Sequence, residues 1–315
     1  MTVSFLIAAH NEQEFLEECI DSCFVQEGDH EVQVCTVDDG STDRTAEILS
    51  NLQVRYPNLL VDVFPSNRGK VAAFNRAFER STGEIIALIG ADDVNLPIRL
   101  KTMVPVLSQA AVACSDLIPF RDSVRYQPLV RARYGYRSNR EFSFGELLRL
   151  QVVYGNTLMA RREAWAPLFP IPSDLDHEDW YLSLKSALAN GPISFVPSPT
   201  INYRIHQLQT SAVDPRDSAR LQKWRRRLSR DLPMYERLLE EPDLDPLDRR
   251  FVEDRVQLLR LYRRRHVDLG TLFAPTLTAI ERLMAFFIIT CGYRVGYAVY
   301  RLGRHVRERK MFRPA

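Results

Sequence analysis

The 315-residue sequence carries 42 Lys and Arg against 40 Asp and Glu, a formal net charge of +2. Its 45% hydrophobic and 26% charged residues exclude a disordered or collagen-like chain. An odd total of five cysteines argues against a disulfide framework, so Cys19 and Cys23 are expected to be buried thiols in a reducing compartment. We expect no secretory signal, because no basic region followed by an apolar run opens the chain.

The charge is distributed unevenly along the chain. Residues 1–215 hold 19 basic and 27 acidic side chains, whereas residues 216–315 hold 23 basic and 13 acidic ones. This asymmetry predicts two regions with different tasks: a domain over residues 1–215 and a basic, helical extension over residues 216–315 that binds an anionic partner.

The first hundred residues alternate between strand and helix patterns. Strands are expected at residues 3–9, 32–37, 61–64 and 84–89, and helices at residues 12–26, 43–52 and 70–80. Such repetition predicts an α/β fold, with a mostly parallel sheet flanked by helices and a ligand at the carboxyl ends of the strands.

The pattern changes after the fourth strand. A helix is expected from Pro97 and is interrupted at Pro105. Residues 116–176 look irregular, which is typical of a functional loop region. Regularity returns with a helix over residues 178–189 and a strand over residues 193–196.

Two acidic motifs follow predicted strands. Asp38 and Asp39 stand where a strand gives way to a helix and can accept hydrogen bonds from a nucleotide base, although Ser41 or Asp43 could simply cap that helix. Gly90-Ala91-Asp92-Asp93 follows the strand expected at residues 84–89. Its carboxylates suit a hard divalent cation together with substrate phosphates, or else form a solvated turn.

Later polar residues could complete such a site. Glu178-Asp179 opens a helix, whose dipole would keep a base ionised, unless the pair is only a surface cap. Arg204 is suited to bidentate phosphate contacts, with His206 as a further donor or a purely structural residue. Lys70, opening a helix after Asn67-Arg68-Gly69, is a similar phosphate candidate.

Across about residues 1–210 the chain resembles the family-2 glycosyltransferases, which have the GT-A fold. The resemblance rests on six segments in that family's order: Val3–Glu12 (VSFLIAAHNE), Val37–Asp43 (VDDGSTD), Asn67–Asn75 (NRGKVAAFN), Ala91–Asp93 with Pro97, Glu178-Asp179, and Tyr203–His206 (YRIH). It implies a Rossmann-like GT-A domain with a helical C-terminal extension.

The resemblance also implies roles for individual residues. Asp179 matches the catalytic base, and Asp92 matches the ligand of a divalent Mn²⁺ or Mg²⁺, with Asp93 or His206 as alternative ligands. Glu178 and Trp180 fall on the acceptor side. The donor nucleotide and its diphosphate are expected to contact Ala8, Ala9, Asn11, Glu12, Asp38, Asp39, Lys70, Ala91, Arg204 and His206.

The implied reaction is an inverting, metal-dependent transfer of one sugar, for which UDP-sugar is the expected donor. The expected setting is the synthesis of a cell-envelope polysaccharide, lipopolysaccharide or glycolipid. The segment Gln222–Arg226 lacks the Q-x-x-R-W order and the flanking apolar spans of processive synthases, so one sugar per encounter is expected. Gly90 departs from the family pattern, because it stands where the metal-binding DXD element begins with Asp.

The basic extension predicts peripheral contact with an anionic membrane. Residues 283–293 are uncharged but too short to span a bilayer, and an arginine series follows them. The enzyme is therefore expected in the cytoplasm at the inner face of the membrane, with a saccharide or lipid-linked acceptor. Solvated helical packing is the alternative, and the sequence shows no nucleic-acid recognition motif.

Two other functions remain open at this point. A non-catalytic protein that binds nucleotide sugars, or serves as a scaffold, is compatible with Gly90. A nucleotidyltransferase also uses strand-end carboxylates, but residues 8–12 lack the glycines of its phosphate loop.

Overall fold

The structure is a computed structural model that describes residues 1–150, 152–206, 230–264, 275–278 and 281–283. These residues form two compact units. The first comprises residues 1–173 and 177–205, and the second comprises residues 174–176 and the described residues from 206 onward. The expected boundary at residue 215 falls outside the described residues and stays a prediction.

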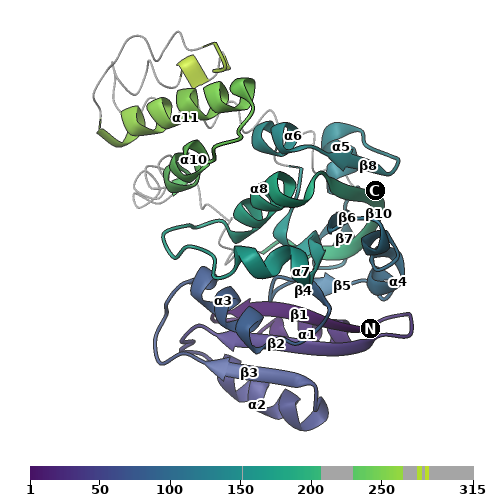
Figure 1. The fold of residues 1–315 in the computed structure, drawn as a ribbon. Coiled ribbons are helices and arrows are strands. Elements are labelled where there is room, and N and C mark those ends of the chain that lie inside the picture. Colours follow the sequence, from purple (N-terminus) through teal and green to yellow (C-terminus); the bar gives the residue numbers. More distant parts are fainter. Residues whose placement is uncertain (151, 207–229, 265–274, 279–280, 284–315) are drawn as a thin grey trace. The chain divides into compact units, whose positions relative to one another are not determined.

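A ten-stranded sheet forms the centre of the first unit (Figure 1). The main path of the sheet runs in the order β3-β2-β1-β4-β9-β6-β10-β5, and β7 and β8 pair at its side. The strands are β1 (Thr2–Ala9), β2 (Glu31–Asp38), β3 (Leu59–Val63), β4 (Ile85–Leu88), β5 (Val94–Asn95), β6 (Val112–Arg121), β7 (Val124–Arg125), β8 (Arg140–Phe142), β9 (Met159–Arg161) and β10 (Ile193–Arg204).

Six of these strands run in one direction. β1 pairs in parallel with β2 and β4, β2 with β3, and β6 with β10. β9 is antiparallel to both β4 and β6, so β6 and β10 keep the direction of β4. The carboxyl ends of all six strands therefore lie at one edge of the sheet, and the expected mostly parallel α/β sheet is confirmed.

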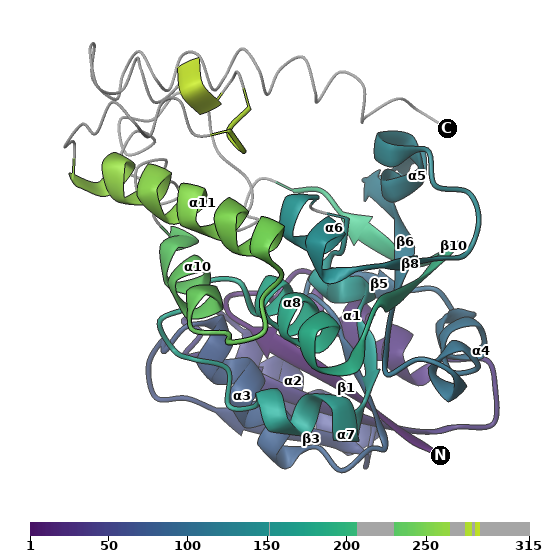
Figure 2. The same cartoon turned by 45° about the horizontal axis from the view of Figure 1, so that its top comes forward.

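Helices cover both faces of the sheet (Figures 1 and 2). α1 (Leu16–Phe24), α2 (Thr45–Arg55) and α4 (Arg99–Met103) lie on one face, and α3 (Lys70–Arg80), α7 (Arg162–Trp165) and α8 (Glu178–Asn190) lie on the other. The shorter helices are α5 (Leu129–Tyr134) and α6 (Phe144–Arg149), with 3₁₀ turns η1 (Val106–Ser108), η2 (Gly155–Thr157) and η3 (Ala166–Leu168).

Apolar spacing explains why these segments fold as they do. In α3, which has the predicted bounds, Val71, Phe74 and Ala77 recur at helical spacing and are buried. β1 runs between two neighbours, and Val3, Phe5 and Ile7 are completely buried. The interruption at Pro105 is also confirmed, because α4 ends at Met103 and a short 3₁₀ turn follows.

The region 116–176 is more regular than predicted. Its first residues belong to β6, a ten-residue strand in the interior of the sheet. A buried aspartate, Asp116, hides this strand from a hydropathy pattern, because a charged residue is unexpected there. The carboxylate of Asp116 accepts the backbone N–H groups of Leu117, Val130 and Arg131 at 2.8, 2.8 and 2.9 Å.

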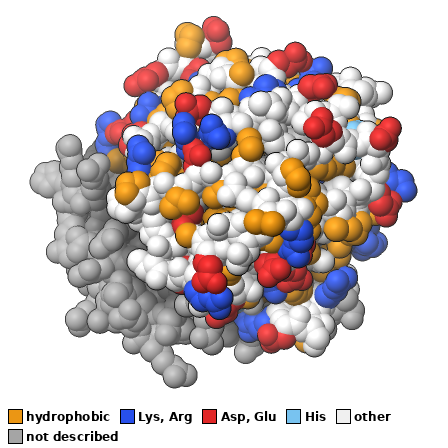
Figure 3. Space-filling view, turned by 90° about the horizontal axis from the view of Figure 1, so that it is seen from below, with side chains coloured by type: hydrophobic (Ala, Val, Ile, Leu, Met, Phe, Trp, Pro, Cys, Tyr) orange, Lys and Arg blue, Asp and Glu red, His pale blue; other side chains and the backbone are white. Residues whose placement is uncertain are grey.

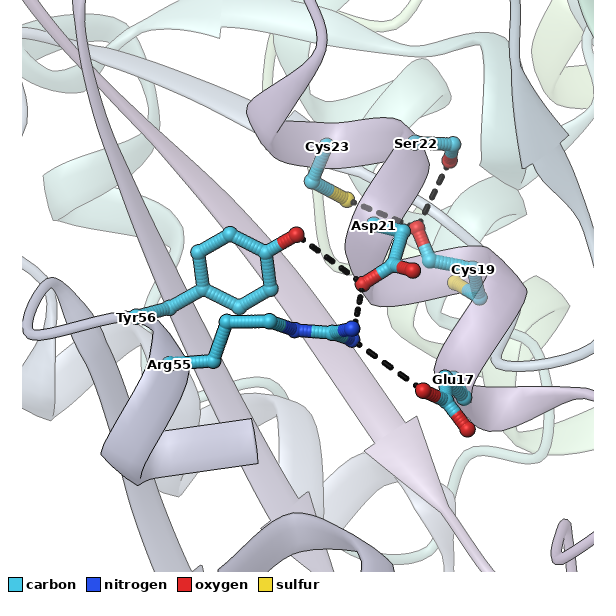
Figure 4. A network of polar contacts seen from close by, with 7 residues as sticks. All are labelled: Glu17, Cys19, Asp21, Ser22, Cys23, Arg55 and Tyr56. Atoms are coloured by element: carbon cyan, nitrogen blue, oxygen red, sulfur yellow. Dashed lines mark hydrogen bonds and ion pairs between the residues drawn. The ribbon is translucent and has the colours of Figure 1, made fainter. Parts of the chain in front are cut away.

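The helices α1 and α2 are joined by exposed polar contacts (Figure 4). Arg55 at the end of α2 forms ion pairs with Glu17 and Asp21 of α1, and the hydroxyl of Tyr56 donates to Asp21 at 3.0 Å. On the inner side of α1, Cys19 and Cys23 are completely buried free thiols, as predicted. On the face seen in Figure 3, acidic and basic side chains of the described residues are interspersed.

The second unit contains two described helices, α10 (Leu232–Leu239) and α11 (Pro246–Arg264). Their apolar faces pack together, and an ion pair of 2.7 Å joins Arg260 to Glu236. Asp254 of α11 accepts a hydrogen bond of 2.7 Å from the hydroxyl of Thr276. Within the described residues, no helix is both long enough and apolar enough to span a membrane. Residues 284–315, which include most of the predicted interfacial segment and its arginines, lie outside the description.

Candidate functional site

The loops after β1 and β2 are fastened to each other at the carboxyl edge of the sheet. The backbone N–H of Asn11 donates to Ser41 Oγ at 2.9 Å, and Asn11 Oδ1 accepts the N–H of Thr42 at 2.8 Å. Asn11 has a φ of 57°, a left-handed conformation that asparagine tolerates better than most residues. α2 begins at Thr45, and Asp43 Oδ1 accepts the N–H of Thr45 at 2.9 Å, so Asp43 caps the start of the helix as the capping alternative expected.

Asp39 anchors the next loop with both of its carboxylate oxygens. Oδ1 accepts the N–H of Arg68 at 2.6 Å, and Oδ2 accepts the N–H of Gly69 at 2.8 Å. The loop also lies close to Gly40, where an added Cβ would come within 2.4 Å of the Ser66 backbone. Asp39 therefore shapes the wall of the predicted base pocket, in addition to its expected contact with the base.

The neighbouring Asp38 is also buried, but it is not saturated. Its Oδ1 accepts the backbone N–H and the hydroxyl of Ser41. Its Oδ2 has no hydrogen-bond partner among the described residues. Because a buried carboxylate oxygen without a donor is costly, Asp38 is the better placed of the pair to receive a new hydrogen bond.

The acidic loop, residues 90–93, follows β4. One of its carboxylates, that of Asp93, is hydrogen-bonded to the protein through both oxygens. Asp93 is 2% exposed. Its Oδ1 accepts the backbone N–H of Arg204 at 3.0 Å, and its Oδ2 accepts the side-chain amide of Asn156 at 2.6 Å. Burial, reinforced by the neighbouring Asp92, holds the pKa of Asp93 well above its ordinary value.

The backbone at Gly90 lies close to the carboxylates of Asp92 and Asp93. A Cβ added to Gly90 would lie 2.8 Å from Asp92 Oδ1 and 2.8 Å from Asp93 Oδ2. A side chain at position 90 would therefore require the Asp92 and Asp93 carboxylates to rotate away. Asp92, which is partly exposed, is left as the carboxylate best placed for a divalent cation.

The described residues do not form a metal site by themselves. They contain no group of three or more His, Cys, Asp or Glu residues that could hold a metal ion. Mg²⁺ and Mn²⁺ are commonly bound by one or two carboxylates together with substrate phosphates. Asp92 fits a site that the donor's diphosphate completes.

Arg204 fastens the acidic loop to α1 and to the end of β10. Its guanidinium lies 4.8 Å from the ring centre of Phe15 and 4.6 Å from that of Phe120. Nε donates to the carbonyl oxygen of Asp92 at 2.8 Å, and Nη2 forms an ion pair with Glu18. Its predicted contact with a diphosphate would therefore require exchange of the Glu18 partner. His206 belongs to the second unit.

Helix α8 begins at Glu178, as predicted, and presents two carboxylates of different character. Glu178 is 5% exposed and forms an ion pair of 2.7 Å with Lys70. Burial raises its pKa, and Lys70 partly offsets that effect. Asp179 is partly exposed, and its Oδ1 accepts the N–H of Trp180 at 2.8 Å. A partly exposed carboxylate at a helix N-terminus is suited to act as a base.

Glu12 adds an acidic group beside this loop. Burial first, then Asp92 and then Asp43 raise the pKa of Glu12 to about 8. Its backbone N–H donates to the hydroxyl of Thr45 at 2.9 Å. Glu12 therefore carries a proton over much of the neutral range.

Sequence reasoning missed the buried residue Arg99. Its guanidinium donates to Asn95 Oδ1 at 2.6 Å and to the Leu88 carbonyl at 2.9 Å, and it faces the ring of Phe5. Burial lowers its pKa to about 10. The only signal was an asparagine four residues before an arginine, which is common on exposed helices.

The predicted site residues of the first unit thus meet at one sheet edge through a chain of contacts. Asp39 holds the loop that ends at Gly69, directly before Lys70, and Lys70 pairs with Glu178. Ala8 and Ala9 end β1, and Ala91 lies in the acidic loop that Arg204 holds.

Comparison with known proteins agrees with this arrangement. Residues 4–167 match the sequence model of glycosyl transferase family 2. An uncharacterized glycosyltransferase of Nostoc sp. is 34% identical over 112 residues, or 36% of this chain and 34% of that protein. The putative glycosyltransferase EpsH of Bacillus subtilis is 26% identical over 220 residues, or 65% of this chain and 61% of that protein. The chain therefore spans less than two thirds of the length of these relatives.

Solved structures show the same fold. S. aureus TarS 1–349 in complex with UDP-GlcNAc matches with a TM-score of 0.68 at 17% identity, over 96% of this chain and 92% of that one. The mannosyltransferase PcManGT from Pyrobaculum calidifontis, in complex with GDP-Man and Mn²⁺, matches with a TM-score of 0.56 at 18% identity, over 95% of this chain and 86% of that one. The GT-A fold expected from the resemblance is confirmed.

Proposed function

Because the chain belongs to glycosyltransferase family 2, we propose that it transfers one sugar from a UDP-sugar to an acceptor hydroxyl, with inversion at the anomeric carbon. The observation that carries the proposal is the convergence of three features at one sheet edge. These are the buried pair Asp38-Asp39, the acidic loop with Asp92, and the partly exposed carboxylate of Asp179.

Asp38 and Asp39 form the proposed wall of the nucleotide pocket. The unpartnered Oδ2 of Asp38 can accept an N–H from a base, and Asp39 keeps the loop of Arg68 and Gly69 closed beside it. Uracil is the proposed base, as in the UDP-GlcNAc complex of TarS, whose fold this chain shares.

Asp92 is the proposed ligand of a divalent cation, which would neutralise charge on the diphosphate of the departing nucleotide when bound. Lys70 lies 2.7 Å from Glu178 and is 45% exposed, so it can turn toward an anion in solution. Arg204 can contribute in the same way if Glu18 gives up its ion pair. These cations would supply the electrostatic stabilisation that a developing diphosphate charge needs.

Asp179 is the proposed base. It would accept the proton of the acceptor hydroxyl while the hydroxyl oxygen attacks the anomeric carbon from the side opposite the diphosphate. Asp179 lies in the first turn of α8, where the free N–H groups of a helix interact favourably with an anion. Trp180 follows directly and is proposed to lie on the acceptor side.

The test combines binding with turnover. A thermal-shift screen of nucleotides and nucleotide sugars with Mn²⁺ identifies the donor, because a ligand stabilises the state that it binds. With that donor, Asp179→Asn should lower kcat about 10³-fold, the range expected for removal of a general base, and leave nucleotide binding unchanged.

The matched control is Glu163→Gln, which alters a 74% exposed carboxylate on α7. It should turn over donor at the wild-type rate. Equal turnover by wild type and Asp179→Asn would show that Asp179 is not the base.

A non-catalytic, nucleotide-sugar-binding protein is the second candidate. Gly90 and the lack of a three-ligand metal group among the described residues favour it. This candidate predicts thermal stabilisation by a nucleotide sugar without turnover at any Mn²⁺ or Mg²⁺ concentration.

For the proposed transferase, the acceptor is proposed to be a saccharide or lipid-linked saccharide of the cell envelope, reached at the inner face of the membrane through the basic extension.

A further inference from the structure

The 3₁₀ turn η2 touches two parts of the site that are far apart in sequence. It consists of only three residues, Gly155–Thr157, and lies between α6 and β9 in the chain. Asn156 contacts the acidic loop, and Gly155 contacts Asp179, the proposed base.

Asn156 is the contact with the acidic loop. Its side-chain amide donates to Asp93 Oδ2 at 2.6 Å, on the opposite side of the carboxylate from the Arg204 N–H. The carbonyl oxygen of the same Asn156 side chain is buried and has no hydrogen-bond partner among the described residues. Since Asn156 leaves this buried oxygen unsatisfied while it donates to Asp93, the side chain is positioned for Asp93 rather than for its own best solvation.

Gly155 is the contact with Asp179. An added Cβ at position 155 would lie 2.9 Å from Asp179 Cβ, closer than Cβ contacts normally come. The first turn of α8 is therefore packed directly against the backbone of η2. The base can move toward η2 only if η2 also moves.

We propose that η2 is a spacer that fixes the distance between the acidic loop and the base, and that Asn156 is its positioning residue. This inference rests on the proposed function of Asp92 and Asp179. A displacement of either end by about 1 Å would misalign the donor and the acceptor hydroxyl, which costs on the order of a hundredfold in rate. Asn156 contacts no reacting atom and acts through Asp93 and through its neighbour Gly155.

The first experiment needs no activity and uses the full chain. Asn156→Asp keeps the size of the side chain and replaces the donor that faces Asp93 by an oxygen. Hydrogen-exchange mass spectrometry should show faster exchange both in peptides covering residues 89–95 and in peptides covering residues 177–183. Faster exchange confined to residues 89–95 would overturn the proposal.

A second variant approaches the spacer from its other end. Gly155→Ala leaves Asn156 and Asp93 unaltered but forces Asp179 away. It should also raise exchange in residues 89–95, and unchanged exchange there would again overturn the proposal. Asn156→Ala supplies the same test if Asn156→Asp does not fold.

The matched control is Asn75→Ala. Asn75 makes two comparable amide hydrogen bonds to the backbone of Ile171, at 2.8 and 2.7 Å, away from the acidic loop. It should raise hydrogen exchange around residue 171 and leave exchange unchanged at the two ends of the spacer, residues 89–95 and 177–183. Exchange at the spacer ends equal to that of Asn156→Asp would show a general loosening of the fold.

Kinetics give the functional readout. With the donor identified for the wild type, Asn156→Asp and Gly155→Ala should lower kcat ten- to a hundredfold, with donor KM within about threefold. A rise in donor KM at unchanged kcat would mean that η2 serves binding alone and would overturn the proposal. A wild type that turns over no nucleotide sugar contradicts the proposed function instead, while the exchange results still decide whether η2 couples the two ends.

Discussion

The aspartates at this sheet edge differ in what their carboxylate oxygens contact. Both oxygens of Asp93 are bound by an N–H, and both oxygens of Asp39 hold a loop. Asp38 keeps one oxygen unpartnered among the described residues, and Asp179 is partly exposed. The first two therefore build the site, and the latter two are positioned to act on a ligand.

Asp39→Asn tests the building role. The variant amide would present N–H to a backbone N–H of Arg68 or Gly69, so one of the two hydrogen bonds that hold the loop would be lost. We expect donor KM to rise at least tenfold with a smaller change in kcat, measured by steady-state kinetics with the identified donor. An unchanged KM would contradict the role of the loop in binding. Exposed Asp122→Asn is the control.

Glu12 links stability to pH. Its pKa is raised from 4.5 in the unfolded chain to about 8 in the folded protein. The folded state therefore binds the extra proton, and the free energy of unfolding should fall as pH rises from about 4.5 to about 8. Because Glu12 is partly exposed, we expect a contribution of about 2 kcal/mol, roughly half of the full linkage value.

Urea unfolding in EDTA at pH 5, 7 and 8.5 measures this contribution. Glu12→Gln removes the titrating group and should flatten the pH dependence by that amount. A variant with the same pH dependence as the wild type would show that other groups cause it. Glu14→Gln, which alters an exposed neighbour, is the control.

Elements of this fold are held by contacts that do not follow sequence order. The helix α5 has no side-chain cap of its own, and its first N–H groups are accepted by Asp116 of β6. The strand β5 has only two residues, yet it pairs with β10 and fixes the acidic loop that precedes it. In both cases a short element is held in place by hydrogen bonds to a strand elsewhere in the chain.

Asp116→Asn should show this dependence. The amide would place an N–H donor opposite the N–H of Arg131 or Val130, which leaves a buried donor unsatisfied. We expect the free energy of unfolding to fall by about 1–3 kcal/mol in urea titration. Faster hydrogen exchange should be concentrated in residues 128–135, and a loss spread evenly over the sheet would contradict the role as a cap.

The sequence predicted elements that have a local pattern, and it missed contacts between residues that are far apart in the chain. α3 was predicted to the residue, and the strands β1 and β2 within a residue at each end, because their apolar spacing is local. The acidic residues at strand ends were found for the same reason. Asn156 and the strand around Asp116 were not found, since their partners lie 63 and 14 residues away in the chain. Arg99 was not found either, because besides Asn95 and Leu88 it donates to the carbonyl of Leu158, 59 residues away. No local pattern records such pairs.

The whole molecule combines an acidic half with a basic half. In the described part of the second unit, α11 packs on α10, Leu277 is buried, and Asp254 accepts a hydrogen bond from the hydroxyl of Thr276. A deletion that starts at residue 275 would therefore damage this unit. Residues 284–315 can be removed without touching those contacts.

Removal of residues 284–315 tests membrane contact. The segment carries seven basic residues and one acidic residue. We expect the full chain to cosediment with vesicles that contain anionic lipid, and to do so less as salt is raised, whereas the truncated chain stays in the supernatant. Cosedimentation that survives the truncation would exclude this segment as the contact. Vesicles of neutral lipid are the control.

The fastening of the acidic loop has a consequence for how the protein is made. Asp92 and Asp93 leave the ribosome early, but their partners Asn156 and Arg204 are synthesised 63 and 111 residues after Asp93. A nascent chain therefore carries the whole DXD region for a long time before the loop has its final shape. A fragment that stops at residue 167, where the family match ends, contains Asn156 but neither Arg204 nor Asp179, the proposed base. The part of the chain that the family model matches is thus complete before Asp179 and Arg204 are synthesised.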